Sequence, residues 1–329
     1  MVKRTTVSEV ATAAGVSVAT VSRVLNGGAV KQTTATKVWE AAARLNYTPN
    51  ALTKSIFAGR SSTIGVLIDD LSSPFYLDLM RGIDEVADAN GSLVMFASTF
   101  RHDGREVAQV ETMDEQRVRG LIVTTSESTD DRTRRLAAGG TPCVVVARSV
   151  RNPPSYVHSV ALDNYVAGRL IANHLISCGR LSVGVLTSGP GPSQRDRTEG
   201  LRQGLAEAGI SLPDEAVAAV DRNERVSDAI GALLEHRPRM DALVCLTGRR
   251  TVAAHSALAD RGLVLPDDVG FLTMDDFAWA PALGITVVAQ PSHQMGRRAA
   301  ELIVENPTDP AQLTFEPKLI SRFSCGESR

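Results

Sequence analysis

The sequence contains few cysteines, and they are not spaced as metal ligands. The four are Cys143, Cys178, Cys245 and Cys325. Because no C-x-x-C pair or Cys/His cluster occurs, neither a disulfide framework nor a metal site is predicted. Two of the cysteines lie in the apolar runs PCVVVA and ALVCLT, where a reduced thiol in a core is expected. The protein is therefore expected to need no metal and no cofactor.

Long apolar runs are also absent. No stretch approaches the roughly 18 apolar residues that a membrane span needs, and the N-terminus MVKRTTVSEVATAAG has no apolar segment of the kind a secretory signal requires. We therefore expect a cytoplasmic protein with no membrane partner.

Enzyme motifs are missing as well. The chain has no G-x-S-x-G, H-E-x-x-H, Walker-A or G-x-G-x-x-G element, and its six histidines show no metal spacing. The glycine-rich SGPGP segment has prolines that remove backbone donors a phosphate cradle would need. The sequence therefore does not predict an enzyme, and an assay that showed turnover would revive that alternative.

The charge of the chain is divided unevenly along its length. Residues 1–60 carry eight Lys and Arg against two Glu, a net charge of +6, so the remainder carries −8 of the total of −2. A basic head on an acidic body predicts a polyanion partner for the head alone. At 329 residues, with 43% apolar residues, the chain is long enough for two or three cored units.

The head has the pattern of a helix-turn-helix. Apolar residues at 7, 10, 11 and 14 predict a short amphipathic helix that ends at Gly15. Ser17 can cap a second helix, which Asn26-Gly27 stops, and a third helix begins at Thr33 or Thr34. The second helix, within GVSVATVSRVLNG, has small outward side chains and one arginine, which suits a helix lying in a DNA major groove.

Several side chains of the head are suited to contact DNA. Arg23 can donate two hydrogen bonds to a guanine, and Val18 and Ala19 can contact a thymine methyl group. Hydroxyl groups can donate to phosphates. The predicted DNA-binding residues are Thr5, Ser17, Val18, Ala19, Thr20, Ser22, Arg23, Asn26, Asn50, Lys54 and Ile56.

A short helix is predicted between head and body. Thr48-Pro49 favours a helix start and Gly59 a stop, which leaves about nine residues, too few to be stable alone. We expect this hinge helix to fold only when DNA or a partner holds it. Ile56 and Phe57 could wedge between base steps of a minor groove.

The segments TVSEVATAAGVSVATVSRVLNG, AARLNYTPNAL and TIGVLIDDLSSPF resemble the LacI/GalR family of bacterial transcription regulators, and the resemblance runs from Thr6 to about Glu316. It implies that residues 18, 19 and 23 read bases, and that Ile56 occupies the place of the family's minor-groove leucine. It also implies a periplasmic-binding-protein-like body whose chain crosses between two lobes near residues 161, 290 and 320.

The body alternates strand-like and helix-like segments, which is typical of parallel α/β sheets. The predicted fold is multidomain: a small all-α helix-turn-helix head (1–47), a hinge helix and linker (48–61), and a two-lobed α/β body (62–329). One lobe would hold residues 62–160 with 291–319, and the other 161–290 with 320–329. Such lobes bind ligands beyond the carboxyl ends of their strands.

Polar residues that follow the strands of the body are the candidate effector site. Ser126, Arg148 and Thr247 each lie just after a predicted strand. By resemblance, Arg197 matches an arginine that faces the effector, Asp275 matches an acidic residue that binds the effector from the far lobe, and Ser73 and Phe75 match a pocket wall. The predicted effector-binding residues are Ser73, Phe75, Ser126, Arg148, Arg195, Arg197, Thr247 and Asp275. For Arg197 an ion pair at a helix start, and for Asp275 a helix cap, stay open as alternatives.

The pocket departs from its relatives in ways that bear on the ligand. Thr247-Gly248 stands where the family commonly has Asn-Asp, Ala147 where it often has Asp, and residues 221–231 contain no stacking ring. Sugar hydroxyls need paired polar groups and an aromatic face. An ordinary hexose is therefore disfavoured, and a smaller, less hydroxylated or anionic ligand is expected near Arg148, Arg195, Arg197 and Arg249.

The sequence as a whole predicts a sequence-specific transcription regulator, most simply a repressor that binds a palindromic operator as a homodimer under control of a small molecule in the cleft. Candidate dimer contacts are SPFYLDLMRGIDEVADA, TVAAHSALADRG and DDFAWAPAL, and Phe277 and Trp279 of the last segment could belong to the core instead. A regulator without effector control and a solute-binding receptor are the alternatives.

Overall fold

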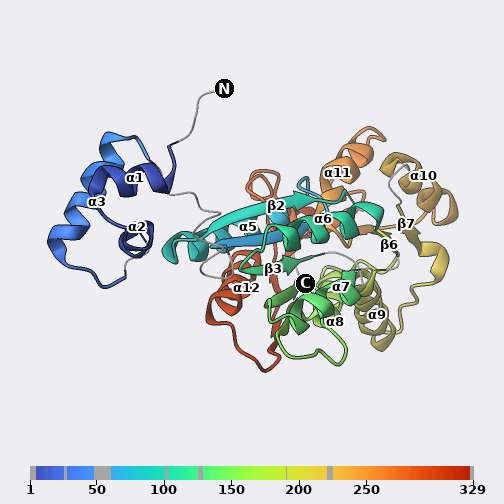
Figure 1. Cartoon of the computed structure of the whole chain (residues 1–329). Coiled ribbons are helices and arrows are strands. Elements are labelled where there is room, and N and C mark those ends of the chain that lie inside the picture. Colours follow the sequence, from blue (N-terminus) through green and yellow to red (C-terminus); the bar gives the residue numbers. More distant parts are fainter. Residues whose placement is uncertain are drawn as a thin grey trace. The chain divides into compact units, whose positions relative to one another are not determined.

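A computed structural model describes residues 5–25, 28–47, 61–100, 103–124, 129–189, 191–220 and 225–326. The chain divides into two compact units (Figure 1). The first takes in the described residues up to Ser62 together with Gln116–Val118, and the second takes in the rest. The two units are described separately below.

The head is a three-helix unit. Helix α1 (Val7–Ala14) begins with a capping box, in which the Thr6 hydroxyl accepts from the Glu9 N–H and the Glu9 carboxylate accepts from the Thr6 N–H. Gly15 ends it at φ 67°, a left-handed conformation that glycine adopts without strain. The Ser17 hydroxyl caps α2 (Val18–Leu25) by accepting from Thr20 N–H at 3.1 Å. Helix α3 (Gln32–Arg44) starts slightly before the predicted threonines.

The core of the head forms where the apolar faces of its three helices meet. Its buried members are Val10, Ala11, Val21, Val24, Val38, Ala41 and Ala42. Seven small aliphatic side chains are a small core, and the surrounding half-buried residues, among them Leu45 and Tyr47, extend it. The core fixes which face of α2 points outward.

The first lobe of the body is built on a six-stranded sheet, in the order β11-β5-β4-β3-β1-β2. All its pairings are parallel. Its strands are β1 (Thr63–Ile68), β2 (Leu93–Ser98), β3 (Gly120–Val123), β4 (Cys143–Val146), β5 (Val157–Leu162) and β11 (Gln312–Phe315). Its helices are α5 (Pro74–Ala89), α6 (Asp103–Glu115), α7 (Asp130–Ala138) and α12 (Ser292–Glu305).

The second lobe repeats this plan with the order β12-β10-β9-β8-β6-β7, where only β12 runs antiparallel to its neighbour. Its strands are β6 (Val183–Thr187), β7 (Val217–Ala219), β8 (Ala242–Cys245), β9 (Gly270–Met274), β10 (Thr286–Ala289) and β12 (Lys318–Ile320). Its helices are α8 (Asn164–Ser177), α9 (Pro192–Glu207), α10 (Val226–His236) and α11 (Thr251–Ala259), with 3-10 turns η2 (Asp214–Ala216), η3 (Gly248–Arg250) and η4 (Phe323–Cys325).

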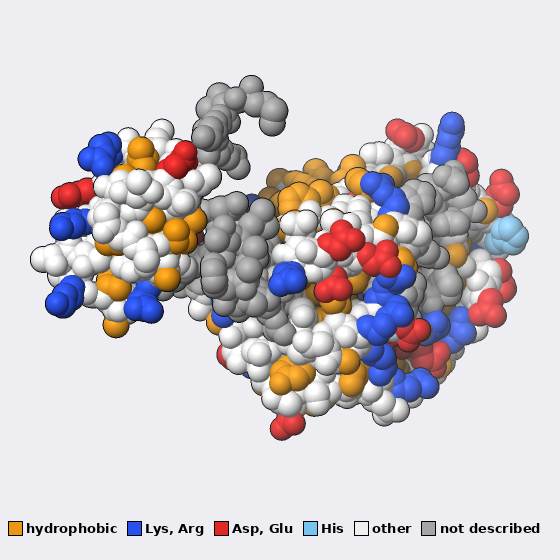
Figure 2. All heavy atoms as spheres, in the orientation of Figure 1, with side chains coloured by type: hydrophobic (Ala, Val, Ile, Leu, Met, Phe, Trp, Pro, Cys, Tyr) orange, Lys and Arg blue, Asp and Glu red, His pale blue; other side chains and the backbone are white. Residues whose placement is uncertain are grey.

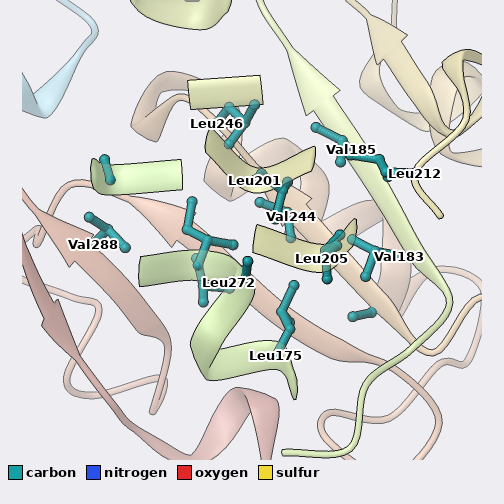
Figure 3. Packing of buried hydrophobic residues seen from close by; sticks show 14 of the residues in the cluster. Leu175, Val183, Val185, Leu201, Leu205, Leu212, Val244, Leu246, Leu272 and Val288 are labelled. Carbon is teal, nitrogen blue, oxygen red and sulfur yellow. The ribbon is translucent and has the colours of Figure 1, made fainter. Parts of the chain in front are cut away.

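Alternate side chains of each strand face opposite layers, so each sheet is buried on both sides. Along β8, Ala242 and Val244 pack with α8 and α9 in one core cluster, whereas Leu243 and Cys245 pack with α10 and α11 in another. Figure 3 shows the first of these clusters, with Leu201 and Leu205 of α9 beside the strand residues. Because both faces of each sheet are covered, nearly every residue along a central strand is apolar.

The chain passes between the two sheets at three places in the described part of the body: after β5, after β10 and after β11. Each passage is short. Asp163 joins β5 to α8, Gln290-Pro291 joins β10 to α12, and Glu316-Pro317 joins β11 to β12. These passages are the covalent links between the lobes.

Each lobe contains one pair of helices that touch backbone to backbone through glycine. In the second lobe, a Cβ atom on Gly168 of α8 would lie 2.5 Å from the backbone nitrogen of Leu201 in α9. In the first lobe, a Cβ atom on Gly296 of α12 would lie 2.9 Å from the carbonyl carbon of Leu79 in α5. Because real Cβ atoms do not come this close to other atoms, only glycine fits at either crossing.

The fold class predicted from the sequence is confirmed: a helix-turn-helix region precedes a two-sheet α/β body. Helix α7 and the strands β5, β7, β10, β11 and β12 were not predicted from the sequence. All four cysteines are buried free thiols, which confirms the prediction made for Cys143 and Cys245. The hinge helix was predicted in residues that lie outside the described part of the chain, and the exact domain boundaries stay predictions.

Candidate functional site

A cavity of about 420 Å³ lies where strand ends of both sheets meet. Its walls come from segments that follow β1, β3, β4, β6, β8 and β9 and from the first turns of α5 and α9. The lining residues are Asp69, Asp70, Ser73, Phe75, Tyr76, Glu106, Thr124, Val146, Ala147, Arg148, Ser188, Gly191, Pro192, Ser193, Gln194, Arg197, Thr247, Arg249, Asp275 and Gln290. The volume is in the lower part of the usual range for ligand sites, which suits a small molecule.

Arg197 is a buried cation in the wall of this cavity. It lies in the second turn of α9, and its guanidinium donates to Asn164 Oδ1 at 2.7 Å and to the Leu246 carbonyl at 2.9 Å. Burial lowers the pKa of Arg197, and the charge of Asp275 opposes that change. Of its five N–H groups, two have no hydrogen bond to any residue that the structure describes, and they are available to a ligand.

Asp275 is the buried acid of the same lobe. It follows β9 at φ 71°, a left-handed conformation that is uncommon for a residue with a side chain. Gln290 Nε2 donates to its Oδ1 at 2.6 Å. Burial raises the pKa of Asp275, and the neighbouring Arg197, Gln290 and Gly248 N–H offset part of the rise. No helix begins at Asp275, so the helix-cap alternative is wrong.

Arg197 is hydrogen-bonded to residues at two of the passages between the lobes. Asn164 directly follows the first passage, and Gln290 lies in the second, with its Oε1 3.5 Å from Arg197 Nη2. Gln290 also holds Asp275. A ligand that moves Arg197 or Asp275 therefore acts directly on the segments that join the lobes.

In the first lobe, Arg148 is already neutralised. It follows β4 and forms an ion pair with Asp130, the first residue of α7. A second contact of the same pair joins Nη1 to Oδ2 at 3.4 Å. Because each arginine that lines the cavity has an acidic neighbour, and the lining acids include Asp69 and Glu106, the cavity has no excess of positive charge.

Side-chain hydrogen bonds from Arg249 and Ser193 cross the cleft between the lobes. Arg249 Nη1 of η3 donates to Asp70 Oδ2, beyond β1, at 3.0 Å. Ser193 Oγ, in the first turn of α9, donates to the carbonyl of Ala147 at 2.9 Å. Ala147 has φ 71°, like Asp275 at the corresponding strand end of the other lobe.

Most of the predicted effector residues lie together. Ser73, Phe75, Arg148, Arg197, Thr247 and Asp275 all line the cavity. Arg195 does not: it is exposed and is not part of the lining, because a residue two positions before Arg197 on a helix points to another side. Ser126 lies outside the described residues.

The sequence analysis missed several lining residues. Tyr76, Glu106, Gln194 and Gln290 were not predicted, although Tyr76 directly follows the predicted Phe75 and Gln290 stands between an apolar strand and a proline. Asn164, which positions Arg197, was missed as well. Phe75 and Tyr76 form an edge-to-face pair with ring centroids 5.2 Å apart. Aromatic faces in the cavity therefore come from α5, although residues 221–231 contain no aromatic ring.

The outer face of α2 has the character predicted for a recognition helix. Val18 is 44% exposed, and Ala19 and Arg23 are exposed, whereas Val21 and Val24 face the core. Gly28 leaves room for the stem of Arg23, because a Cβ there would lie 2.6 Å from Arg23 Cγ. In Figure 2 the acidic side chains of the head are few, in keeping with its sequence.

The hydroxyls predicted to contact phosphates also have partners within the head. Thr5 Oγ1 donates to the Leu45 carbonyl at 2.9 Å, which ties the start of the head to the end of α3. Thr20 and Ser17 share a hydrogen bond of 2.9 Å between their hydroxyls. Ser22 is half-buried on α2. The predicted residues Asn26, Asn50, Lys54 and Ile56 lie outside the described part of the chain.

The described residues contain neither a metal-binding cluster nor a membrane-spanning helix. No group of three or more His, Cys, Asp or Glu side chains there is placed to hold a metal ion. No helix of the described chain is both long and apolar enough to cross a membrane.

Comparisons with known proteins match both units. Residues 6–50 match the family described as bacterial regulatory proteins, lacI family, and residues 61–322 match periplasmic binding proteins and the sugar binding domain of the LacI family. The regulator PtxS of Pseudomonas aeruginosa is 31% identical over 98% of this chain and 96% of its own length. The ribose operon repressor of Bacillus subtilis is 30% identical, over 91% of this chain and 90% of its own length.

Solved structures agree with these matches. The lac repressor dimer bound to operator and an anti-inducer superposes with a TM-score of 0.83 at 23% identity, covering 99% of this chain and 100% of that one, and it shows the shared fold. A complex of the transcriptional regulator CelR with cellobiose superposes with a TM-score of 0.72 at 26% identity, over 98% of this chain and 100% of that one. The chain therefore belongs to the LacI family of bacterial regulatory proteins: it is a DNA-binding transcriptional regulator of the repressor type with an effector-binding domain, and not an enzyme.

Proposed function

We propose that this cytoplasmic chain binds a palindromic operator as a homodimer, and that a small neutral hydroxylated molecule in the cavity between its lobes controls the binding. The cavity itself carries this proposal, because strand ends of both lobes line it and Arg197 links it to the passages between them. A ligand held there makes different contacts when the lobes are open and when they are closed, so its affinity differs between the two arrangements. Such a difference in affinity is what couples ligand binding to DNA binding.

The charge of the cavity supports a neutral ligand over the anion that the arginines suggested in the sequence. Arg148 is paired with Asp130 and Arg249 with Asp70, and Arg197 faces Asp275. An anion in the cavity would also lie near the lining acids Asp69, Asp70 and Glu106, which would repel it. Ligand hydroxyls, by contrast, can accept from Arg197 and donate to Asp275.

Aromatic faces favour a hydroxylated ring. The expectation against a hexose depended on Thr247-Gly248 and Ala147 and on a missing stacking residue. Phe75 and Tyr76 of α5 line the cavity and can supply the aromatic face. A sugar ring presents C–H groups to an aromatic face and hydroxyls to polar side chains. Neutral monosaccharides are therefore included among the proposed ligands.

For the DNA contact, we propose that α2 lies in the major groove. Arg23 would donate to a guanine, Val18 and Ala19 would contact base edges, and Ser17, Thr20 and Ser22 would contact phosphates at the helix start. The Thr5 hydroxyl donates to the Leu45 carbonyl and would thereby position the head. Thr5 would contact a phosphate only through a bridging water, from which its hydroxyl accepts, or through its backbone. Asn26, Asn50, Lys54 and Ile56 remain proposed contacts.

For the dimer, we propose that the edge strand β2 of the first lobe contacts a second copy. Leu93 is 74% and Phe96 52% exposed on β2, and Leu77 of α5 is exposed as well. Exposed apolar side chains on an unpaired sheet edge favour association. Phe277, by contrast, is buried and stacks on Trp279 at 4.5 Å between ring centroids, so it belongs to the core of the second lobe.

The DNA part of the proposal is tested by selecting random duplexes with the purified chain at moderate salt and sequencing those that bind. A palindrome of two half-sites about one helical turn apart supports the dimeric repressor. Enrichment of a single half-site, or of no motif with and without metabolite extract, would refute it.

The ligand part is tested by calorimetry with a matched panel of neutral monosaccharides, the corresponding sugar acids and the amino sugars. Neutral compounds are expected to bind, and Arg197→Lys is expected to weaken them by at least tenfold, since a lysine cannot make the same forked contacts. Tighter binding of the acids than of their neutral counterparts would contradict the proposed ligand class.

A further inference from the structure

The cleft of the body is spanned by an ion pair whose two members belong to different lobes. Asp70 follows β1 of the first lobe, and Arg249 lies in η3, which follows β8 of the second. Arg249 Nη1 is 3.0 Å from Asp70 Oδ2, and both side chains line the cavity. Arg249 is 15% and Asp70 19% exposed, so the pair is largely shielded from solvent. Shielded pairs are screened less by salt than surface pairs.

Both partners are held in place by their own lobes. The Ser72 backbone N–H donates to Asp70 Oδ1 at 2.9 Å, which fixes the carboxylate. Burial alone would raise the pKa of Asp70, but the hydrogen bonds from Ser72 and Arg249 outweigh it and the pKa lies below its ordinary value. On the other side, Gly248 packs so tightly that a Cβ there would lie 2.8 Å from the Phe277 ring. The turn that carries Arg249 is therefore packed directly against the core of its own lobe.

We propose that Asp70 and Arg249 form a latch that holds the two lobes closed over the cavity when no effector is bound. The proposal depends on the proposed function only in taking this cavity as the effector site. Because each partner is fixed to its own lobe, the lobes cannot separate without breaking the pair. The Ser193–Ala147 hydrogen bond, which also crosses the cleft, adds a second and weaker restraint.

The latch sets how often the cavity opens to solvent. A charge-assisted hydrogen bond that is shielded from solvent contributes more free energy than an exposed ion pair does. For this partly shielded pair, loss of the latch is expected to raise the open population about tenfold. An effector then enters faster and binds more tightly, since less free energy is used to open the cleft.

The experiment measures entry into the cavity with a thiol reporter in the full-length chain. Ser73 lines the cavity and makes no side-chain cap bond to α5, so Ser73→Cys places a thiol there. The native cysteines are buried, and their slow reaction with an aromatic disulfide reagent is measured in the chain without the reporter. In the reporter chain, Asp70→Asn is expected to speed the reaction about tenfold, and Arg249→Gln is expected to act alike.

Two controls make the test specific. Asp214→Asn removes an exposed ion pair with Arg202 elsewhere in the second lobe and is expected to leave the rate unchanged. The exchanged pair Asp70→Arg with Arg249→Asp is expected to restore a slow rate. Denaturation midpoints of all variants show that each is folded.

An unchanged rate in both single variants, or an equal increase in Asp214→Asn, would overturn the latch. This readout uses neither DNA nor effector. Its failure is therefore distinct from a failure of the operator selection or of the ligand panel.

Discussion

Replacing Gly168 by alanine should destabilise the second lobe and displace its buried arginine. The new Cβ would lie 2.5 Å from Leu201 N and 2.9 Å from the Gly200 carbonyl carbon, and closer still to the carbonyl oxygen of Arg197. Ordinary contact begins at 3.4 Å, so α8 and α9 must separate by about 0.9 Å or more at this point. All three opposing atoms belong to the backbone, which cannot rotate away as a side chain can.

The size of the effect follows from two opposing contributions. Overpacking of a close-packed interior costs about 1–3 kcal/mol, and a backbone clash belongs at the upper end. Alanine in place of glycine inside a helix contributes about 1 kcal/mol in the other direction. The expected loss is therefore about 2 kcal/mol or more of unfolding free energy. With a urea slope of about 3 kcal/mol per molar, the midpoint falls by about 0.7 M.

The assay can be confined to the lobe that contains the change. Trp279 packs in the core of the second lobe, whereas Trp39 is half exposed in the head, so a Trp39→Phe background leaves fluorescence from Trp279 alone. Gly104→Ala is the matched control, because Gly104 lies in α6 with nothing within 4 Å of its Cβ position. The control should keep or slightly raise the midpoint. If Gly168→Ala unfolds within 0.1 M of the parent, the close backbone contact deduced here is refuted.

Three further predictions test other parts of the molecule. Arg23→Ala should weaken binding to the selected operator by about 1–3 kcal/mol and abolish the base preference at one position of each half-site. Fluorescence anisotropy with single-base operator variants measures both effects. An equal loss of affinity for all sequences would show that Arg23 contacts a phosphate instead. Phe96→Asp should weaken self-association in sedimentation experiments, whereas Leu181→Asp, an equally exposed site in the other lobe, should not. The pKa of Asp275 in the folded chain is raised above its ordinary value of 3.8, so the protonated carboxyl stabilises the fold below pH 3.8, and this stabilisation is lost as the pH rises through the folded pKa. The parent should therefore gain stability relative to Asp275→Asn when the pH falls through that range. A difference in stability that stays constant with pH would contradict a buried carboxyl that binds a proton.

Patterns along the chain predicted the features that depend on neighbouring residues. The three helices of the head followed from apolar spacing, from Ser17 as a cap and from Gly15 as a stop, because caps and turns act within a few residues. The parallel sheets followed from apolar runs that end in polar residues. Six of the eight predicted effector residues line one cavity, because strand ends of a parallel sheet meet at one edge.

Features set by distant residues were missed. Helix α7 begins with Asp130-Asp131 and contains three arginines, so its apolar periodicity is weak, and contacts with the sheet stabilise it. Strand β7 has only three residues and depends on pairing with β6. The pairing of Arg148 with Asp130 and of Arg249 with Asp70 joins positions far apart in the chain. Without those pairs the arginines suggested an anionic ligand, and with them the cavity favours a neutral one.

Both lobes contain a pair of helices whose backbones touch at a glycine, and this close packing limits where the molecule can move. Each has a helix crossing at a glycine: Gly168 of α8 packs against α9 in one lobe, and Gly296 of α12 packs against α5 in the other. At neither crossing is there space for the helices to slide past each other. Interiors packed this closely move as bodies, so a change between states must take place at the passages between the lobes.

The resemblance between the lobes ends at the cavity. One strand end carries Asp275 and the corresponding one carries Ala147, both in a left-handed conformation. The second lobe thus supplies the neighbouring pair Arg197 and Asp275, and the first lobe supplies the aromatic rings, the ion-paired Arg148 and the latch acid. Since Arg197 and Asp275 are both bonded to Gln290 at a passage, the lobe that recognises the ligand most directly is also the one attached to the hinge. Ligand recognition and lobe movement therefore share one hydrogen-bond network, which is why substitutions at Gln290 should change coupling more than they change affinity.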